Sequence, residues 1–438
     1  MQEPATIDDF IEESRTCGLG LEEWLRWQET LNPRLVDLGL DRLRPVAGEM
    51  GLSSLPMPVV TVAGTNGKGS SIAYLEAILE RAGHPVAAYT SPYLERYNET
   101  LRIAGREVSD EALVKAFENV ERARNGVALT FFEYRTLATF DIIRRAPVSV
   151  ALLEVGLGGR LDAVNLVDAD VAVVTTIDLD HSEWLGPDRE SVGREKAGIF
   201  RRGRVAVCGD RSPPRSLVAH ARALGTQLNT LGVEFSIADD DGGWRWRGPA
   251  GEHRHLPQPR LAGDVQRANA AVALMTLQIL APRLAVDEDA VRDGIAAAWL
   301  PGRQQVFAGP VERVVDVAHN PEAARALAQT LAARPASGRT LAVFALLADK
   351  DAPAVAAPLA DIVDEWHTAD LTGPRGRSGE HLAATLREMF PDRGVRAHPS
   401  VAAAWHAARA IARDGDRLIA FGSFATAREA LALERRAA

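Results

Sequence analysis

Cysteine is scarce in this chain of 438 residues, which contains only Cys17 and Cys208. Two distant cysteines form no disulfide framework, and they lack the close spacing of a zinc-ligand pair. The sequence therefore argues against a small disulfide-stapled fold and against a cysteine-based metal site. It favours a reducing compartment.

Long apolar runs and an excess of positive charge are also missing. No apolar stretch reaches the ~18 residues that a membrane-spanning helix needs. The first residues, MQEPATIDDFIEES, are polar and acidic, unlike a secretory signal. We therefore expect a cytoplasmic protein with no membrane partner. The formal net charge of −9 argues against non-specific binding of nucleic acid.

Apolar residues are plentiful, at 46% of the chain, and the length is typical of two or three domains. Short, almost continuously apolar runs alternate with segments of helical periodicity. Such runs are typical of strands covered by helices on both faces, which predicts a doubly wound, mainly parallel α/β sheet. The runs occupy residues 59–62, 148–154, 171–176 and 204–207. A helical spacing also opens the chain, at Leu21, Leu25, Leu31, Leu35 and Leu38.

The pattern changes twice in the second half. Residues 232–259 contain two Trp and several Gly, which indicates a small hairpin excursion, and residues 260–281 return to helix. The segment 300–303, Leu-Pro-Gly-Arg, interrupts the pattern and is our predicted inter-domain hinge. A second alternating series follows, with strands expected at 313–317, 340–346, 362–368 and 417–422. We therefore predict a first domain over residues 1–299 and a smaller Rossmann-like domain over residues 300–438.

A glycine-rich segment lies between the first apolar run and a helical pattern. It consists of Gly64, Thr65, Asn66, Gly67, Lys68, Gly69 and Ser70. Glycines let backbone N–H groups approach phosphates, and a helix N-terminus attracts anions. Lys68 can neutralise the outer phosphate oxygens. This context predicts a nucleotide-binding phosphate loop rather than an ordinary turn, although Val62 stands where the usual P-loop has its first glycine.

Ionisable side chains follow two other expected strands. Glu154 ends the run 148–154, and a carboxylate at the carboxyl end of a parallel strand suits Mg²⁺. His181 follows Asp178 and Asp180 after the run 171–176, and we interpret it as a functional residue. Either aspartate could instead cap the next helix. Taken alone, Lys196 would be an ordinary surface lysine on a helix.

Many ordered segments resemble those of bacterial folylpolyglutamate synthases/dihydrofolate synthases of the bifunctional type, in the Mur ligase superfamily. The similarity covers almost the whole chain. It is carried by residues 36–42, 62–70, 91–99, 131–136, 153–165, 178–200, 300–303, 316–321, 349–351, 373–376 and 422–424. Two positions depart from the family pattern: Tyr93 stands where His is common, and Val317 where Gly is common.

The resemblance implies an acid–amino-acid ligase that uses ATP and two Mg²⁺ ions to join L-glutamate to dihydropteroate and to tetrahydrofolate. Ser91, Glu154 and His181 would hold one metal, and a carbamylated Lys196 would help to hold the second. Asn269 would contact adenine, Arg303 the ATP phosphates, and Asp316 and His319 the nucleotide. The first domain would carry the ATP and folate sites, and the second would be the glutamate-ligase domain.

The same resemblance implies a reaction through an acyl phosphate, with Lys68 and Arg303 neutralising charge during phosphoryl transfer. Three alternatives stay open. The protein could be a folylpolyglutamate synthase only, a cell-wall Mur ligase, or a nucleotide-gated binding protein with a degenerate site. We expect small-molecule partners and a monomer.

Overall fold

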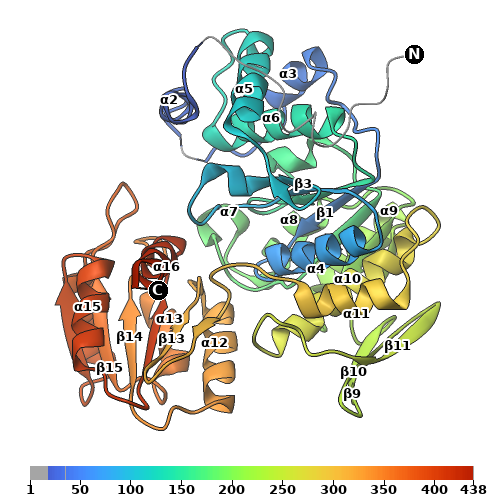
Figure 1. The fold of residues 1–438 in the computed structure, drawn as a ribbon. Coiled ribbons are helices and arrows are strands. Elements are labelled where there is room, and N and C mark those ends of the chain that lie inside the picture. Colours follow the sequence, from blue (N-terminus) through green and yellow to red (C-terminus); the bar gives the residue numbers. More distant parts are fainter. Residues whose placement is uncertain (1–17, 35, 438) are drawn as a thin grey trace. The chain divides into compact units, whose positions relative to one another are not determined.

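The computed structural model describes residues 18–34 and 36–437 (Figure 1). Cys17, Leu35 and the first residues, on which the expectation of no secretory signal rests, lie outside that part. The described chain forms two compact units. The first runs to Arg260 and resumes at Arg267–Ala298, and the second comprises Leu261–Gln266 and the chain from Trp299. The assignment of the ATP and folate sites to residues 1–299, and of glutamate ligation to residues 300–438, stays a prediction.

The first unit is built on an eight-stranded sheet in the order β4-β3-β2-β5-β1-β6-β7-β8. Neighbours from β2 to β8 pair in parallel, and β3 and β4 add an antiparallel edge, so the predicted doubly wound sheet is confirmed. The strands are β1 (Val59–Ala63), β2 (Val86–Tyr89), β3 (Leu101–Ile103), β4 (Arg106–Glu107), β5 (Val150–Glu154), β6 (Val171–Val174), β7 (Val205–Cys208) and β8 (Gln227–Thr230).

Helices cover this sheet because their apolar faces bury against it. In α4 (Lys68–Arg81), Ile72, Leu75, Ile78 and Leu79 are fully buried, and Gly83, with φ of +80°, follows the helix end. The helices are α2 (Leu21–Gln28), α3 (Leu43–Glu49), α4 (Lys68–Arg81), α5 (Asp110–Arg124), α6 (Phe131–Arg145), α7 (Ser182–Leu185), α8 (Arg189–Ala197), α9 (Arg215–Leu224), α10 (Val265–Leu280) and α11 (Glu288–Ala297), with 3₁₀ turns at Tyr97–Thr100 and Ala163–Leu166.

The predicted excursion is a separate antiparallel sheet of three strands, beside α11 (Figure 1). Its strands are β9 (Ser236–Asp240), β10 (Gly243–Gly248) and β11 (Gly251–Leu256). Two helices are shorter than the sequence predicted. The opening helix ends at Gln28, so the helical spacing of Leu31 and Leu38 does not continue it, and the later helix begins at Val265 rather than at residue 260.

The second unit has a six-stranded sheet in the order β12-β13-β17-β14-β15-β16, parallel except for β12. The predicted Rossmann-like alternation is confirmed, but β12 and β16 were not expected. The strands are β12 (Gln305–Phe307), β13 (Glu312–Val315), β14 (Thr340–Phe344), β15 (Glu365–Ala369), β16 (Gly394–His398) and β17 (Arg417–Phe421). The helices are α12 (Pro321–Ala333), α13 (Ala352–Ala356), α14 (Gly379–Met389), α15 (Val401–Ile411) and α16 (Phe424–Ala437), with a 3₁₀ turn at Ala357–Leu359.

None of the helices in residues 18–34 and 36–437 combines the length and the hydropathy of a membrane span.

Candidate active site

The glycine-rich segment leaves β1 and enters α4, as predicted, and its shape requires two glycines. Gly64 has φ of +153°, and a Cβ there would lie 1.8 Å from Thr175 Oγ1. Gly67 has φ of +83°, and a Cβ there would lie 2.4 Å from Asn269 Oδ1. A Cβ at either position would force the side chain of Thr175 or Asn269 to move, and the positive φ angles also favour glycine. The close approach also places Asn269, which is buried on α10, beside the loop.

Two threonines at the end of β6 hold the loop in place, and sequence reasoning missed this function. Thr175 Oγ1 donates a hydrogen bond to Asn66 O at 2.5 Å, and Asn66 N donates to Thr176 Oγ1 at 3.1 Å. Strand β6 lies next to β1 in the sheet, which brings its end to the loop. A Thr-Thr pair after an apolar run was the available signal.

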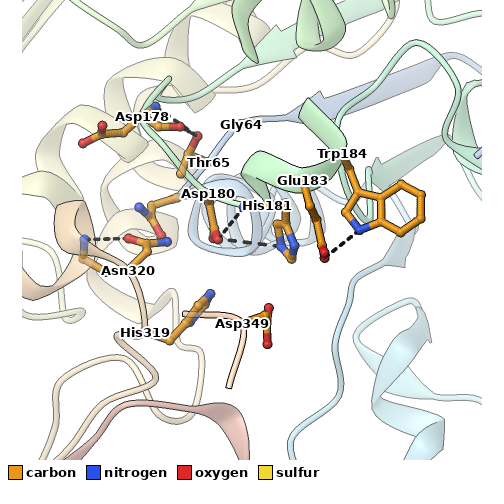
Figure 2. A network of polar contacts seen from close by, with 12 residues as sticks. Gly64, Thr65, Asp178, Asp180, His181, Glu183, Trp184, His319, Asn320 and Asp349 are labelled. Atoms are coloured by element: carbon orange, nitrogen blue, oxygen red, sulfur yellow. Dashed lines mark hydrogen bonds and ion pairs between the residues drawn. The ribbon is translucent and has the colours of Figure 1, made fainter. Parts of the chain in front are cut away.

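Thr65 links the loop to the segment that carries His181. Its hydroxyl donates to Asp178 O at 2.9 Å and accepts from Asp178 N at 3.0 Å (Figure 2). Lys68 begins α4, and its Nζ donates to Gly64 O and Thr65 O at 3.0 and 3.2 Å. The ammonium group therefore lies over the loop's own carbonyl groups, close to the positive end of the helix. Gly69 and Ser70 form the buried first turn.

Ser91 and Glu154 lie together because β2 and β5 are parallel neighbours. Tyr89 pairs with Leu153, so both residues follow the same edge of the sheet. Ser91 N donates to Glu154 Oε2 at 3.1 Å, and Glu154 is 5% exposed. A serine hydroxyl beside a buried carboxylate supplies the hard oxygen atoms that Mg²⁺ prefers, so these residues fit a divalent metal ion.

His181 is the N-cap residue of α7, with φ of +51° and ψ of +41°. Neither Asp178 nor Asp180 occupies that position, so the capping interpretation of these aspartates is wrong. His181 Nε2 lies 4.0 Å from Asp180 Oδ2 (Figure 2), and Asp180 Oδ1 accepts from His181 N at 2.8 Å. The imidazole is partly exposed, which leaves it accessible to a ligand.

Lys196 lies on α8 as predicted, but the surface interpretation is wrong, since the residue is only 3% exposed. The last turn of α8 packs against the loop after β5, where Arg160 N donates to Glu195 O at 2.8 Å. A Cβ on Gly159 would lie 3.0 Å from Lys196 O. Burying an ammonium group is costly, so this position calls for either a compensating anion or a chemical modification.

No group of three or more His, Cys, Asp or Glu side chains in the described part of the chain has the arrangement of a metal site. Of the four predicted ligands, only Glu154 and His181 belong to those residue types. The finding therefore leaves the proposed set of Ser91, Glu154, His181 and Lys196 untested.

In the second unit, Asp316 follows β13 and joins two turns. Its carboxylate accepts from Gln304 N at 2.7 Å and from Ala318 N at 2.6 Å, and the residue is 7% exposed. Burial raises the pKa of Asp316, while the nearby Arg303 opposes that rise. The carboxylate thereby ties the predicted hinge, with Arg303, to the turn that carries His319.

Arg303 and His319 share one aromatic neighbour. The guanidinium carbon of Arg303 lies 5.2 Å from the ring centroid of Phe424, and the His319 ring centroid lies 5.9 Å from it. His319 Nδ1 donates to Val317 O at 2.8 Å. The segments 349–351 and 373–376 also contact each other. Arg375 Nε donates to Asp349 Oδ1 at 3.1 Å, and Arg375 Nη2 donates to Asp349 Oδ2 at 2.6 Å.

The amino-acid sequence is similar to that of known proteins along nearly the whole chain. The dihydrofolate synthase/folylpolyglutamate synthase of Escherichia coli K12 is 44% identical over 417 residues, which cover 95% of this chain and 96% of that protein. This chain belongs to the dihydrofolate synthase/folylpolyglutamate synthase family. Residues 302–424 also match the Mur ligase, glutamate ligase domain family.

Solved structures of this family have the same fold. E. coli FolC in complex with DHPP and ADP has a TM-score of 0.90 and 43% identity, covering 97% of this chain and all of that one. A bifunctional folylpolyglutamate synthase/dihydrofolate synthase with Mn, AMPPNP and L-glutamate bound has a TM-score of 0.87 and 41% identity, covering 95% and 98%. The recognised family and the fold class are thereby confirmed. The roles of individual site residues stay predictions.

Proposed function

We propose that this chain is an ATP-dependent ligase that adds L-glutamate to dihydropteroate and to tetrahydrofolate, releasing ADP and phosphate. The observation that carries the proposal is the glycine-rich loop between β1 and α4, with Gly64 and Gly67 at positive φ, within a chain that is similar over 95% of its length to a dihydrofolate synthase/folylpolyglutamate synthase. Binding of AMPPNP, Mn and L-glutamate by one relative supports ATP, a divalent metal ion and glutamate as ligands here.

The first step is phosphorylation of the substrate carboxylate. A carboxylate oxygen attacks the γ-phosphorus of ATP, the bond to the bridging oxygen breaks, and ADP leaves. Lys68, the loop N–H groups and the N-terminus of α4 neutralise charge on the transferring group. Asn269, beside the loop, is our candidate for the adenine contact.

The second step forms the amide. The glutamate amine attacks the acyl phosphate carbon, the carbon–oxygen bond to phosphate breaks, and the amine loses a proton. Water competes with the amine for the same carbon, so the site must exclude it. We assign Arg303, Asp316 and His319 to the nucleotide, and the shared contacts at Asp316 and Phe424 hold them in place.

Ser91, Glu154 and His181 would hold a first Mg²⁺, and Lys196 a second. A bound metal ion would neutralise phosphate oxygens. Lysine as an ammonium has no acceptor atom, so Lys196 could act as a ligand only in a modified form. A carbamate supplies two oxygens and removes the buried positive charge, in agreement with the 3% exposure of this residue.

The test is turnover of the purified chain with ATP, Mg²⁺ and glutamate, with dihydropteroate and tetrahydrofolate in separate reactions and products identified by mass. Glutamylated products from both substrates are expected. Product from tetrahydrofolate alone would favour the folylpolyglutamate synthase alternative. ATP binding without any product would favour a nucleotide-gated binding protein.

A cytoplasmic location and a monomeric state stay predictions. Gel filtration with light scattering would test the second.

A further inference from the structure

Arg135 is a buried cation on α6 with few partners. The residue is 5% exposed, and its guanidinium carbon lies 4.9 Å from the ring centroid of Phe132 and 5.6 Å from that of Tyr89. Its one hydrogen bond within the described chain runs from Nε to Tyr89 Oη at 3.0 Å. Among the same residues no carboxylate forms an ion pair with it, so its two terminal NH₂ groups have no protein acceptor.

A directed chain of hydrogen bonds holds Arg135 in this position. Thr136 Oγ1 donates to Phe132 O at 2.8 Å, so Tyr89 Oη donates to Thr136 Oγ1 at 3.2 Å and is left to accept from Arg135. Tyr89 and Thr136 are fully buried. The side chain is thus oriented by its Nε atom alone, and the two NH₂ groups remain for another acceptor.

Such an arrangement leaves the positive charge of Arg135 without an anionic partner among the described residues. Burial of a charged group without full hydrogen bonding destabilises a protein, and an isosteric apolar side chain would avoid that cost. Asp162 lies within electrostatic range, but its carboxylate already accepts from Leu157 N and Val164 N at 3.0 and 2.9 Å. A ligand with an oxygen acceptor would complete the site.

The surroundings indicate which ligand fits. Phe132 and Tyr93 are partly exposed aromatic rings, which suit a flat conjugated substrate. Tyr89 precedes Ser91 by two residues, and a Cβ on Gly156, two residues after Glu154, would lie 2.5 Å from Phe132 Cζ. The Arg135 cluster therefore adjoins the Ser91–Glu154 edge, where the first Mg²⁺ is proposed to bind.

We propose that Arg135 is a substrate-binding residue whose terminal NH₂ groups donate hydrogen bonds to an oxygen of the aromatic part of the folate-type substrate. This inference rests on the proposed function. The oxygen belongs either to the pterin ring or to the benzoyl group, and both offer the same acceptor chemistry.

The experiment compares Arg135→Met and Arg135→Lys with Arg145→Met, which alters a more exposed arginine on the same helix. Steady-state kinetics are measured for dihydropteroate, ATP and glutamate, together with thermal unfolding of the ligand-free proteins. Arg135→Met should raise KM for dihydropteroate roughly tenfold or more, as expected for a lost charged hydrogen bond. Its KM for ATP and glutamate, and its kcat, should change less than about threefold. Arg135→Lys should be intermediate.

The unliganded Arg135→Met protein should unfold at the same temperature as the wild type or higher, because an uncompensated charge has been removed. A purely structural arginine would give the opposite result: lower thermal stability with an unchanged KM for dihydropteroate. That outcome would overturn the inference, and so would a rise in KM for glutamate alone. Because wild-type turnover is measured in parallel, failure of the proposed function would be seen separately.

Competition then locates the oxygen. Dihydropterin, which lacks the benzoate, and p-aminobenzoate, which lacks the pterin, are each titrated as inhibitors. Weaker inhibition of Arg135→Met by one of them assigns the contact to that half of the substrate. Equal inhibition of mutant and wild type by both compounds would contradict the proposal.

Discussion

The candidate residues of the two units are held by different means, although residues of both groups, such as Ser91 and Asp316, follow the carboxyl ends of parallel strands. In the first unit, backbone atoms and short threonines fix the loop, and Gly64 and Gly67 leave no space for a side chain. In the second unit, one buried carboxylate and one aromatic ring hold Arg303 and His319. The first arrangement depends on backbone shape, whereas the second depends on side-chain packing.

This difference makes a mutational prediction. Charge removal in the first unit should abolish chemistry and leave the fold intact. Side-chain changes in the second unit should alter affinity or stability by smaller amounts. Four mutational experiments test this difference between the units.

Lys68→Ala should reduce kcat by about 10²-fold or more, because it removes a group that neutralises the transferring phosphoryl group. Its melting temperature should stay near that of the wild type, since Lys68 bonds only to carbonyl groups of its own loop. Lys115→Ala, which alters a half-exposed lysine on α5, is the control. Near-normal turnover of Lys68→Ala would show that the loop is not catalytic.

Lys196→Ala should lose most activity, and acetate or formate should restore part of it by supplying carboxylate oxygens at the vacated position. Lys196→Arg should be inactive and unresponsive, because it keeps a buried positive charge. Turnover measured against acetate concentration checks both. If Lys196→Ala were fully active without added acid, neither the carbamate nor the second metal could be assigned to this residue.

Acid should destabilise the second unit through His367, which is fully buried on β15. Burial, followed by the charges of His398 and Arg396, lowers the pKa of His367 from 6.5 to about 4. Between these values the unfolded chain binds a proton that the folded chain does not. Stability is therefore full above pH 6.5 and falls as the pH drops towards 4, by up to about 1.4 kcal/mol per pH unit.

Urea unfolding of the whole chain from pH 7 to pH 4.5 measures this slope. His367→Gln should flatten it, whereas His406→Gln, an exposed histidine on α15, should not. Equal slopes for all three proteins would remove His367 as the cause.

Phe424→Leu should have the smallest effect, raising KM for ATP about two- to fivefold, because one cation–π contact is worth about 0.5–1 kcal/mol at a partly exposed site. Phe390→Leu is the matched control, since it removes an aromatic ring that stacks on Trp366 in the same unit. An unchanged KM in Phe424→Leu would mean that Arg303 does not depend on this ring.

Sequence reasoning succeeded where the signal is local. The positions of the glycine-rich turn between β1 and α4 and of Glu154 at the end of β5 follow from glycine sterics and strand composition, which act between neighbouring residues. The roles of these residues stay predictions. Sequence reasoning missed β2, an internal strand of the first sheet that is rich in alanine, and the outer strands β3, β4, β8, β12 and β16, whose polar residues interrupt any apolar run. The opening helix was also predicted to be too long, because the apolar spacing continues past Gln28 although the helix ends there.

The family, the α/β alternation and the glycine-rich turn between β1 and α4 could therefore be inferred from the sequence alone, whereas the roles of the site residues stay predictions. The folded structure was needed to show that Lys196 is buried, that Thr175 and Thr176 form hydrogen bonds with the loop, and that Arg135 has no carboxylate partner among the described residues. The physical reason is distance along the chain. Turns and periodicity are set by nearest neighbours, whereas burial and side-chain partnership arise from segments tens to hundreds of residues apart.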